Sequence, residues 1–220
     1  MSARAAILEQ IRQSLKASGE DTARRQRAGA RLEAHPRHTI PERGQLDPEG
    51  RIGLLTQILE GQSASIARLE DIRQAPREIA RYLSGQDIEP ALRIGENEAL
   101  DALDWAGAGV EITRGAADAH TLSACSTAFC AIAESGTLML LSGPQNPVTL
   151  DFLPDNHIII LNAGDVLASY EEGWDKMRAA NMPLPRTVNY ISGPSRTADI
   201  EQTIFLGAHG PRRLHVIITG

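Results

Sequence analysis

The sequence predicts an α/β protein with an open, mostly parallel β-sheet flanked by helices. Short apolar runs typical of strands alternate with stretches of helical periodicity, which is the rhythm of parallel strands joined by helical crossovers. Several runs in the second half are continuously apolar, as expected for strands that are buried on both faces. A chain of 220 residues with 42% hydrophobic and 23% charged residues is long and apolar enough to bury such a core.

The strands and helices are expected to alternate along the chain. Strands are expected over 65–69, 91–94, 110–112, 131–133, 137–141, 157–161, 188–191 and 214–219. Helices are expected over 71–83, 96–105 and 169–180, with a further helix beginning near Ala198.

The amino-terminal segment predicts an amphipathic helix followed by an arm. The apolar positions of this helix are Ile7, Leu8, Ile11 and Leu15. The segment 20–48 is rich in Arg, Ala, Gly, Pro and His and predicts a flexible arm. An N-cap at Asp47 followed by Pro48 begins the folded body. We therefore expect a helix and flexible arm over 1–46 and one α/β domain over 47–220.

The charge balance and the lengths of the apolar runs exclude two classes of protein. A net charge of −6 argues against a protein that binds nucleic acid by neutralising phosphates, because that mechanism needs a surplus of Lys and Arg. No run approaches the roughly 18 to 20 apolar residues of a membrane span, and the first helix lacks the apolar core of a secretion signal. We therefore expect a cytoplasmic protein that neither binds nucleic acid nor spans a membrane.

The cysteines and histidines indicate a chain without a metal or a cofactor of its own. Cys125 and Cys130 are spaced too widely for a redox CxxC pair, and their number fits a reducing compartment. Iron–sulfur clusters usually take four thiolates, so this chain cannot hold one alone. The histidines do not fall at the spacings of a zinc site.

The segment 191–201 predicts an anion-binding loop. A buried strand runs into a loop of Gly, Pro, Ser and Thr and then into the helix expected near Ala198. The free amides and the dipole of a helix N-terminus attract negative charge, and Arg196 can bind a carboxylate or phosphate through two hydrogen bonds. The candidate residues are Gly193, Ser195, Arg196, Thr197, Asp199 and Glu201. A simple helix cap, with Arg196 paired to a nearby carboxylate, explains the same residues equally well.

The segment 131–140 places a charged residue between two apolar strands. Burial there would suit Glu134 to general acid or base work, and Gly136 would let a ligand approach the backbone, with Thr137 beside it. A hairpin in which Glu134 is solvated or salt-bridged and Gly136 supplies a positive φ is the favoured interpretation from spacing alone. His209 and Gly210, in a Gly-rich turn before the last strand, could contact a ligand or only the turn itself.

Three blocks taken together resemble a known family. AIAESGTLML, FLPDNHIIIL and ISGPSRTADIEQTIFLGAHGPRRLHVII are similar, in order and content, to the blocks of the lactate utilization protein C family, which carries the LUD domain. The resemblance implies the fold shared with ribose-phosphate isomerase, glucosamine-phosphate deaminase and coenzyme A transferases. The matching positions are the site candidates Glu134, Gly136, Thr137, Gly193, Ser195, Arg196, Thr197, Asp199, Glu201, His209 and Gly210.

The resemblance also implies a function in bacterial L-lactate utilization, the oxidation of L-lactate to pyruvate, alongside iron–sulfur partner proteins. On this hypothesis the chain is an accessory subunit without a redox cofactor, and the Arg196 loop binds a small anionic ligand. Two alternatives stay open: an enzyme that uses Glu134 on an anionic substrate, by analogy with coenzyme A transferases, and a subunit that senses a metabolite. Homo-oligomerisation is left open as well.

Overall fold

The computed structural model describes residues 3–16, 21–37, 39–200, 203–206 and 210–220, and it divides into two compact units, Met1–Ile40 and Pro41–Gly220. The first unit contains α1 (Ala3–Leu15) and α2 (Thr22–Ala34). Helix α1 confirms the predicted amino-terminal helix, whereas α2 lies in the segment that was expected to be an irregular arm. Asp21 caps α2 by accepting a hydrogen bond from the Arg24 amide, and the run of Ala and Arg that follows favours a helix.

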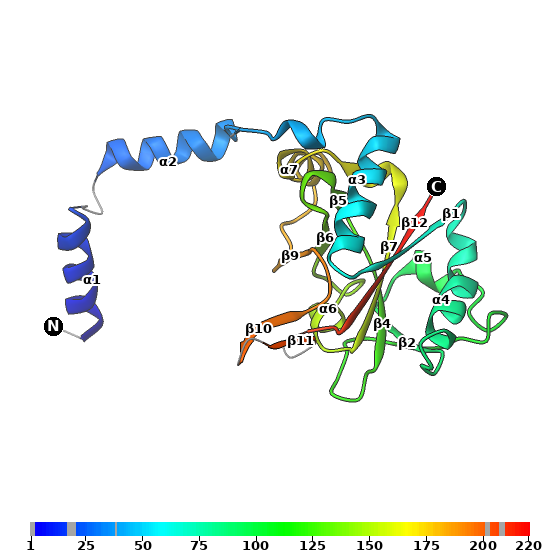
Figure 1. Ribbon diagram of the computed structural model, residues 1–220. Helices are drawn as coiled ribbons and strands as arrows, with labels where there is room; N and C mark the ends of the chain where they lie inside the picture. The colour runs from blue at the N-terminus through cyan, green and yellow to red at the C-terminus, as the bar shows by residue number, and fades with distance from the viewer. Residues whose placement is uncertain (1–2, 17–20, 38, 201–202, 207–209) are drawn as a thin grey trace. The chain divides into compact units, whose positions relative to one another are not determined.

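The second unit is built on a six-stranded sheet whose strands are all parallel (Figure 1). The strand order is β1-β12-β7-β4-β2-β3. The bounds are β1 (Ser65–Leu69), β2 (Ala91–Ile94), β3 (Glu111–Arg114), β4 (Ser123–Thr127), β7 (Asn156–Asn162) and β12 (Arg213–Thr219). The predicted parallel sheet is confirmed, and β4 is an additional strand that its small, polar residues did not reveal.

A second sheet has four strands in the order β8-β5-β6-β9. They are β5 (Cys130–Ile132), β6 (Thr137–Leu141), β8 (Val166–Leu167) and β9 (Val188–Ile191). The 3-10 helix η3 (Ala133–Ser135) and Gly136, with φ of 64°, form the short connection that makes β5 and β6 antiparallel. Because β5 also pairs with β8 in parallel, this smaller sheet is mixed.

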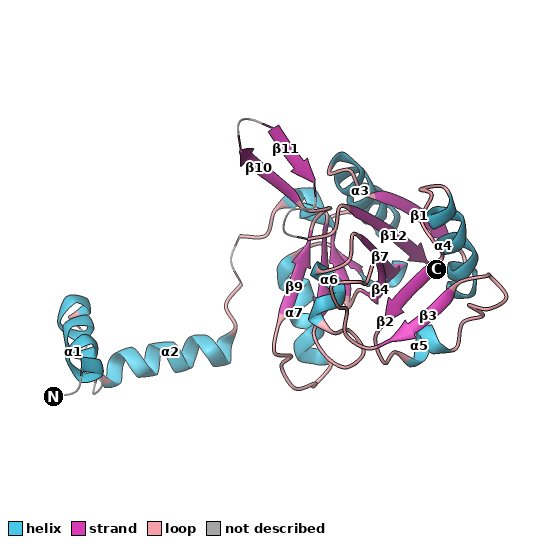
Figure 2. Cartoon of the chain, turned by 90° about the horizontal axis from the view of Figure 1, so that it is seen from below, coloured by secondary structure: helices cyan, strands magenta, loops and turns pink. Residues whose placement is uncertain are grey.

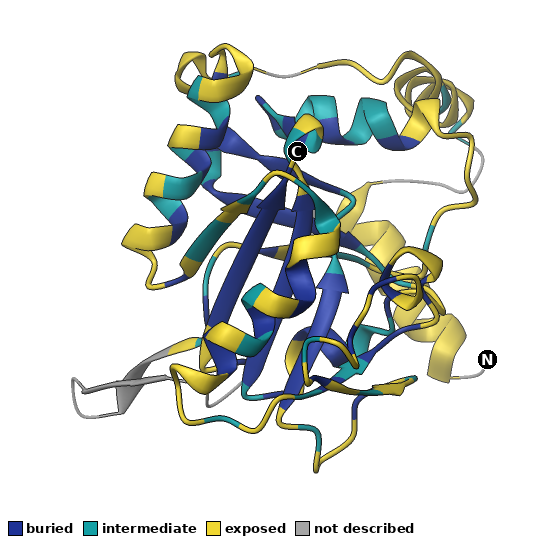
Figure 3. Cartoon of the chain, turned by 90° about the vertical axis from the view of Figure 1, so that its right-hand side faces the viewer, coloured by how far each residue is buried: buried dark blue, intermediate teal, exposed yellow. Residues whose placement is uncertain are grey.

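Helices cover both sheets, and the alternation of side chains along β7 shows how. Ile159 and Leu161 pack with α3 (Pro48–Gly61) and the four-stranded sheet, while Ile158 and Ile160 pack with α4 (Ala75–Ser84) and α5 (Glu98–Asp101). Helix α7 (Tyr170–Ala179) covers the outer face of the four-stranded sheet. The inner strands β4, β7 and β12 of the central sheet are accordingly almost entirely buried (Figure 3).

Short elements complete the second unit. They are α6 (Val148–Phe152) and the 3-10 helices η1 (Glu42–Gly44), η2 (Ile72–Gln74) and η4 (Ala163–Asp165). The helix expected over 96–105 is shortened to α5. Throughout the described chain, no helix is both long and apolar enough to cross a bilayer. Cys125 and Cys130 are buried side chains, each packed among apolar neighbours.

The prediction of a helix beginning near Ala198 is wrong. The chain instead forms an antiparallel hairpin of β10 (Arg196–Ile200) and β11 (Thr203–Leu206), which projects from the second unit (Figure 2). Thr and Ile recur throughout this segment, and β-branched residues favour strands over helices. The predicted helix N-terminus is therefore absent from the described residues 196–200.

Candidate functional site

A cluster of buried polar side chains lies where the two sheets meet. Asp151 from α6 and His157 from the start of β7 are each only 1% exposed. Ser126 from β4 and Asn189 from β9 complete the hydrogen-bonded part of the cluster. Four separate elements thus converge on one carboxyl group inside the protein.

The two carboxyl oxygens of Asp151 have different partners. Asn189 Nδ2 donates to Oδ2 at 2.7 Å, and Ser126 Oγ lies 3.2 Å from Oδ1. Ser126 Oγ also lies 3.0 Å from His157 Nε2, while His157 Nε2 and Asp151 Oδ1 are 3.6 Å apart. His157 Nδ1 is buried and has no hydrogen-bond partner among the described residues. Ser126 therefore bridges the carboxyl group and the imidazole.

Burial shifts both titratable groups toward their neutral forms. Desolvation raises the pKa of Asp151 to about 6, against the smaller opposing effects of hydrogen bonds from Asn189 and Ser126. Desolvation lowers the pKa of His157 to about 3. The imidazole is thus neutral at pH 7, and the carboxyl group titrates close to neutrality, which is typical of groups at functional sites.

A cavity of 200 Å³ adjoins this cluster. Its described lining residues are Asp151, Phe152, His157, Tyr190, Ile191, Ser192, Gly193, Ser195, Gly210, Pro211 and Leu214. Three residues predicted from sequence, Gly193, Ser195 and Gly210, therefore lie in one cavity although they come from two separate segments. The volume suits a ligand smaller than those that fill the usual pockets of about 300 to 1,000 Å³.

The two segments are joined by backbone contacts. The Ser195 amide donates to the Pro211 carbonyl at 2.8 Å. A Cβ on Gly210 would lie 3.3 Å from Ser195 Cβ, and φ of Gly210 is 159°, so a side chain there would crowd the junction. Gly193, with φ of 144°, lies against Gln62 at the end of α3. This wall of the cavity is held in place by main-chain geometry.

A chain of hydroxyl groups runs from the cavity toward the β5–β6 hairpin. Ser192 Oγ lies 2.7 Å from Thr137 Oγ1, which in turn lies 3.0 Å from Tyr170 Oη and 2.8 Å from Ser135 Oγ. Thr137 is 1% exposed. The predicted site residue Thr137 thus contacts the cavity wall through Ser192 and does not line the cavity itself.

Glu134 lies apart from the cavity. Its side chain is 4% exposed, Oε1 accepts a hydrogen bond from the Tyr170 amide at 3.3 Å, and Oε2 is buried without a partner among the described residues. Gly44 of η1 packs directly over Glu134 Cβ and the Ala168 carbonyl. The side chain of Glu134 is therefore almost closed off from solvent, and Gly44 forms part of its cover.

Gly136 supplies the positive φ of the hairpin turn, which was the structural alternative to ligand binding at this residue. Its φ of 64° is the left-handed conformation that the hairpin turn requires, and a Cβ there would overlap Ile58 of α3. The space beside Gly136 is therefore filled by Ile58, and a ligand cannot approach the backbone at this point.

The remaining predicted residues belong to the β10–β11 hairpin and its ends. Arg196 is exposed and donates from Nη2 to Ser63 Oγ at 2.6 Å, so its guanidinium contacts the turn after α3 and does not line the cavity. Thr197 and Asp199 lie in β10, where the backbone is extended. Glu201 and His209 fall outside the described residues. The helix N-terminus on which the predicted anion site was based is not formed by residues 196–200, because they belong to β10.

Asp151, His157, Ser126 and Asn189 were not predicted from the sequence. Asp151 and His157 are six positions apart, in a short helix and at the start of a strand, and no catalytic motif has that spacing. One signal was present: His157 immediately precedes the apolar run 158–161, where a polar side chain must be buried beside the core. Ser126 and Asn189 gave no comparable signal.

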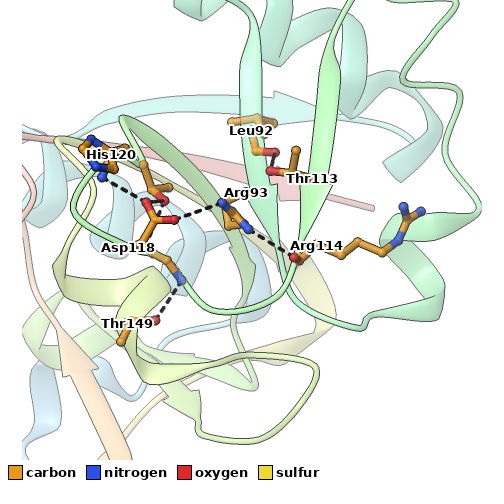
Figure 4. A network of polar contacts seen from close by, with 9 residues as sticks. Leu92, Arg93, Thr113, Arg114, Asp118, His120 and Thr149 are labelled. Atoms are coloured by element: carbon orange, nitrogen blue, oxygen red, sulfur yellow. Dashed lines mark hydrogen bonds and ion pairs between the residues drawn. The ribbon is translucent and has the colours of Figure 1, made fainter.

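Larger cavities lie elsewhere on the second unit. A cavity of 360 Å³ lies beside β2 and β3, where Arg93 donates to the Arg114 carbonyl at 3.2 Å and to Asp118 at 3.4 Å (Figure 4). Its lining also includes Glu89 and Glu111, and this acidic surrounding disfavours an anion. A cavity of 750 Å³ is lined in part by residues 141–146, the end of β6 and the loop that follows it.

The fold and the cavity define a parallel α/β domain with a second, smaller sheet and a buried acid–imidazole pair between them. The chain belongs to the LUD domain family, whose model matches residues 7–219. A crystal structure of a DUF162 family protein from Deinococcus radiodurans is similar in fold, with a TM-score of 0.60 and 19% identity, over 80% of this chain and 99% of that one.

Curated relatives are similar over a shorter stretch. Lactate utilization protein C of Deinococcus radiodurans is 37% identical over 91 residues, which is 41% of this chain and 42% of the relative. The Bacillus subtilis protein of the same name is 33% identical over 90 residues, 40% of this chain and 38% of the relative. An uncharacterized protein of Neisseria meningitidis is 39% identical over 92 residues, 42% of this chain and 40% of the relative. The chain thus spans about two fifths of the length of these relatives.

Proposed function

We propose that this protein is a component of a bacterial L-lactate utilization system and that its 200 Å³ cavity binds a small 2-hydroxy or 2-oxo acid such as L-lactate or pyruvate. The family and the relatives named lactate utilization protein C support the first part. The cavity, with its adjoining acid–imidazole pair, supports the second. The chain would act beside iron–sulfur proteins, since its own two thiols are buried in the core.

The observation that carries the proposal is that Nδ1 of His157 is buried and has no hydrogen-bond partner in the part of the chain that the structure describes. A buried polar atom without a hydrogen bond costs about 1 to 3 kcal/mol, so proteins rarely retain one without a reason. A hydroxyl or carboxyl group of a ligand in the adjoining cavity would satisfy it. Ser195, which lines the same cavity, supplies a hydroxyl group for a second contact.

Thermal unfolding in the presence of ligands tests the proposal. L-lactate or pyruvate should raise the stability, since a ligand at 100 times its Kd adds about 2.7 kcal/mol to the folded state. Propan-2-ol, which lacks the carboxylate, and ribose 5-phosphate, which is larger, should not. Ser195→Leu would fill the cavity and abolish the response, whereas Ser84→Leu, on the exposed end of α4, would not. An unchanged response in Ser195→Leu would contradict the assignment of the site.

A second candidate function is favoured by Glu134. Its Oε2 is buried without a partner among the described residues, so the carboxylate is a candidate acid, base or nucleophile once residues 42–44 open. On this hypothesis the protein transfers an acyl group or hydrolyses a sugar phosphate. Glu134→Gln, with folding checked by circular dichroism, should abolish any such activity, and a retained activity would eliminate the candidate.

A further inference from the structure

His157, Ser126 and Asp151 form a hydrogen-bonded chain. Its donors and acceptors can be arranged in only two ways, one the reverse of the other. The hydroxyl of Ser126 has one proton and lies within reach of both His157 Nε2 and Asp151 Oδ1. When Asp151 is ionised, Nε2–H donates to Ser126 and Ser126 donates to Oδ1. His157 Nδ1 then has no proton and can only accept a hydrogen bond.

Protonation of Asp151 reverses the chain. The carboxyl O–H then donates to Ser126, and Ser126 donates to His157 Nε2. The single imidazole proton must therefore move to Nδ1, which becomes a donor. One proton taken up at Asp151 thus changes the unpartnered Nδ1 from an acceptor into a donor, while the imidazole remains neutral.

Among the described residues, those that surround Asp151 supply no positive charge for an anionic ligand. The groups that face it are Ser126 from β4, Asn146 from the loop before α6, His157 from β7 and Asn189 from β9. Tyr190 is the remaining titratable residue among the described cavity lining. A carboxylate ligand beside an ionised Asp151 would place two like charges in a poorly solvated site, which is strongly unfavourable.

We propose that binding of a carboxylate ligand in the 200 Å³ cavity is coupled to uptake of one proton by the His157–Ser126–Asp151 chain, which presents Nδ1–H to the ligand. This inference rests on the proposed function of the cavity. It assigns His157 the role of the ligand's hydrogen-bond donor and Asp151 the role of a positioning residue that sets the tautomer of His157.

The coupling predicts a definite dependence of affinity on pH. Because burial sets the pKa of free Asp151 to about 6, the Kd for L-lactate should rise about tenfold per pH unit above that value. Asp151→Asn replaces the carboxyl group with an amide that resembles its protonated form and cannot ionise. Its Kd should be independent of pH and about 100-fold lower than that of the wild type at pH 8.

Isothermal titration calorimetry with L-lactate tests the coupling. Titrations at pH 7.5 in phosphate and in Tris, which differ in ionisation enthalpy, give the number of protons taken up. The wild type and the control variant Asp155→Asn, whose carboxylate contacts Arg212 at the surface, should take up about one proton, and Asp151→Asn none. If Asp151→Asn does not fold, the proton uptake of the wild type in the two buffers still tests the coupling.

The outcomes separate the inference from the function on which it rests. Absence of binding by the wild type at pH 5 and by Asp151→Asn at pH 8 would overturn the proposed function. Binding with no proton uptake would overturn only the coupling. A ¹⁵N spectrum of histidine-labelled protein adds a direct readout, since His157 should carry its proton on Nε2 without ligand at pH 8 and on Nδ1 with L-lactate, and an unchanged tautomer would contradict the chain reversal.

Discussion

Asp151 and His157 have opposite effects on the way the free energy of unfolding depends on pH. A carboxyl pKa raised from 3.8 to about 6 stabilises the fold below about pH 4, and this contribution is lost as the pH rises to 6. An imidazole pKa lowered from 6.5 to about 3 stabilises the fold above pH 6.5, and this contribution is lost as the pH falls. Between pH 4 and 6 the two effects nearly cancel.

Asp151→Asn should therefore expose the effect of His157. The free energy of unfolding of the variant should rise with pH more steeply than that of the wild type, by about 1.4 kcal/mol per pH unit between pH 4 and 6. Urea unfolding at pH 4, 5 and 6 measures both slopes. Parallel curves for the two proteins would show that Asp151 is ionised throughout this range.

The sequence predicted some residues of the site and missed others, and there is a physical reason in each case. Gly193, Ser195 and Gly210 belong to turn-forming segments beside strands, and turn residues next to a ligand are recognisable by their type. Asp151 becomes unusual only because β4, β7 and β9 close around it. Burial of this kind is a tertiary property and leaves no pattern in local spacing.

The stability of the turn formed by η3 and Gly136 depends on a close contact between Gly136 and α3. Gly136→Ala should lower the free energy of unfolding by about 2 to 5 kcal/mol, because a left-handed φ costs about 1 to 2 kcal/mol and overlap with Ile58 adds about 1 to 3 kcal/mol. Gly53→Ala in the exposed face of α3, where no atom lies within 4 Å of the new Cβ, is the matched control.

The control should change stability in the opposite direction. Alanine in the middle of a helix is favoured over glycine by about 0.5 to 1 kcal/mol, so Gly53→Ala should be more stable than the wild type. Chemical denaturation of both variants gives the comparison. Equal stabilities for Gly136→Ala and the wild type would mean that the turn does not pack against α3 in the way described.

Apolar periodicity predicted most elements correctly and failed where tertiary contacts decide. Strands such as β6 and β9 have the predicted bounds because their apolar runs are bordered by turn residues. Capping residues predicted a helix beginning near Ala198, yet β10 and β11 pair there as a hairpin. Local capping signals cannot outweigh strand partners that lie three to ten residues further along the chain.

In the whole molecule, the two compact units predict independent stability. Removal of residues 1–40 should leave the free energy of unfolding of the second unit unchanged within about 0.5 kcal/mol, the usual range for changes away from a core. Equilibrium urea unfolding of the truncated and full-length proteins measures the difference. A loss of several kcal/mol would show that the first unit contributes to the core.

The overall class of fold was predictable, but the division into two sheets was not. A strand and helix rhythm defines a parallel α/β protein without specifying which strands pair. Pairing depends on the Gly136 hairpin and on the alternate packing of Ile158 and Ile159 toward opposite faces. The cavity arises from this division, since it lies between the start of β7 and β12 on one side and the end of β9 on the other.

The central claim is that the cavity between the two sheets is the ligand site, and amide chemical shifts measured during titration with L-lactate test it most directly. We expect concentration-dependent shifts at Gly193, Ser195 and Gly210, with the shifts of Ser142 and Thr113 at the other cavities unchanged. Shifts confined to the surroundings of Glu134, or none in a large excess of L-lactate at pH 5, would contradict it.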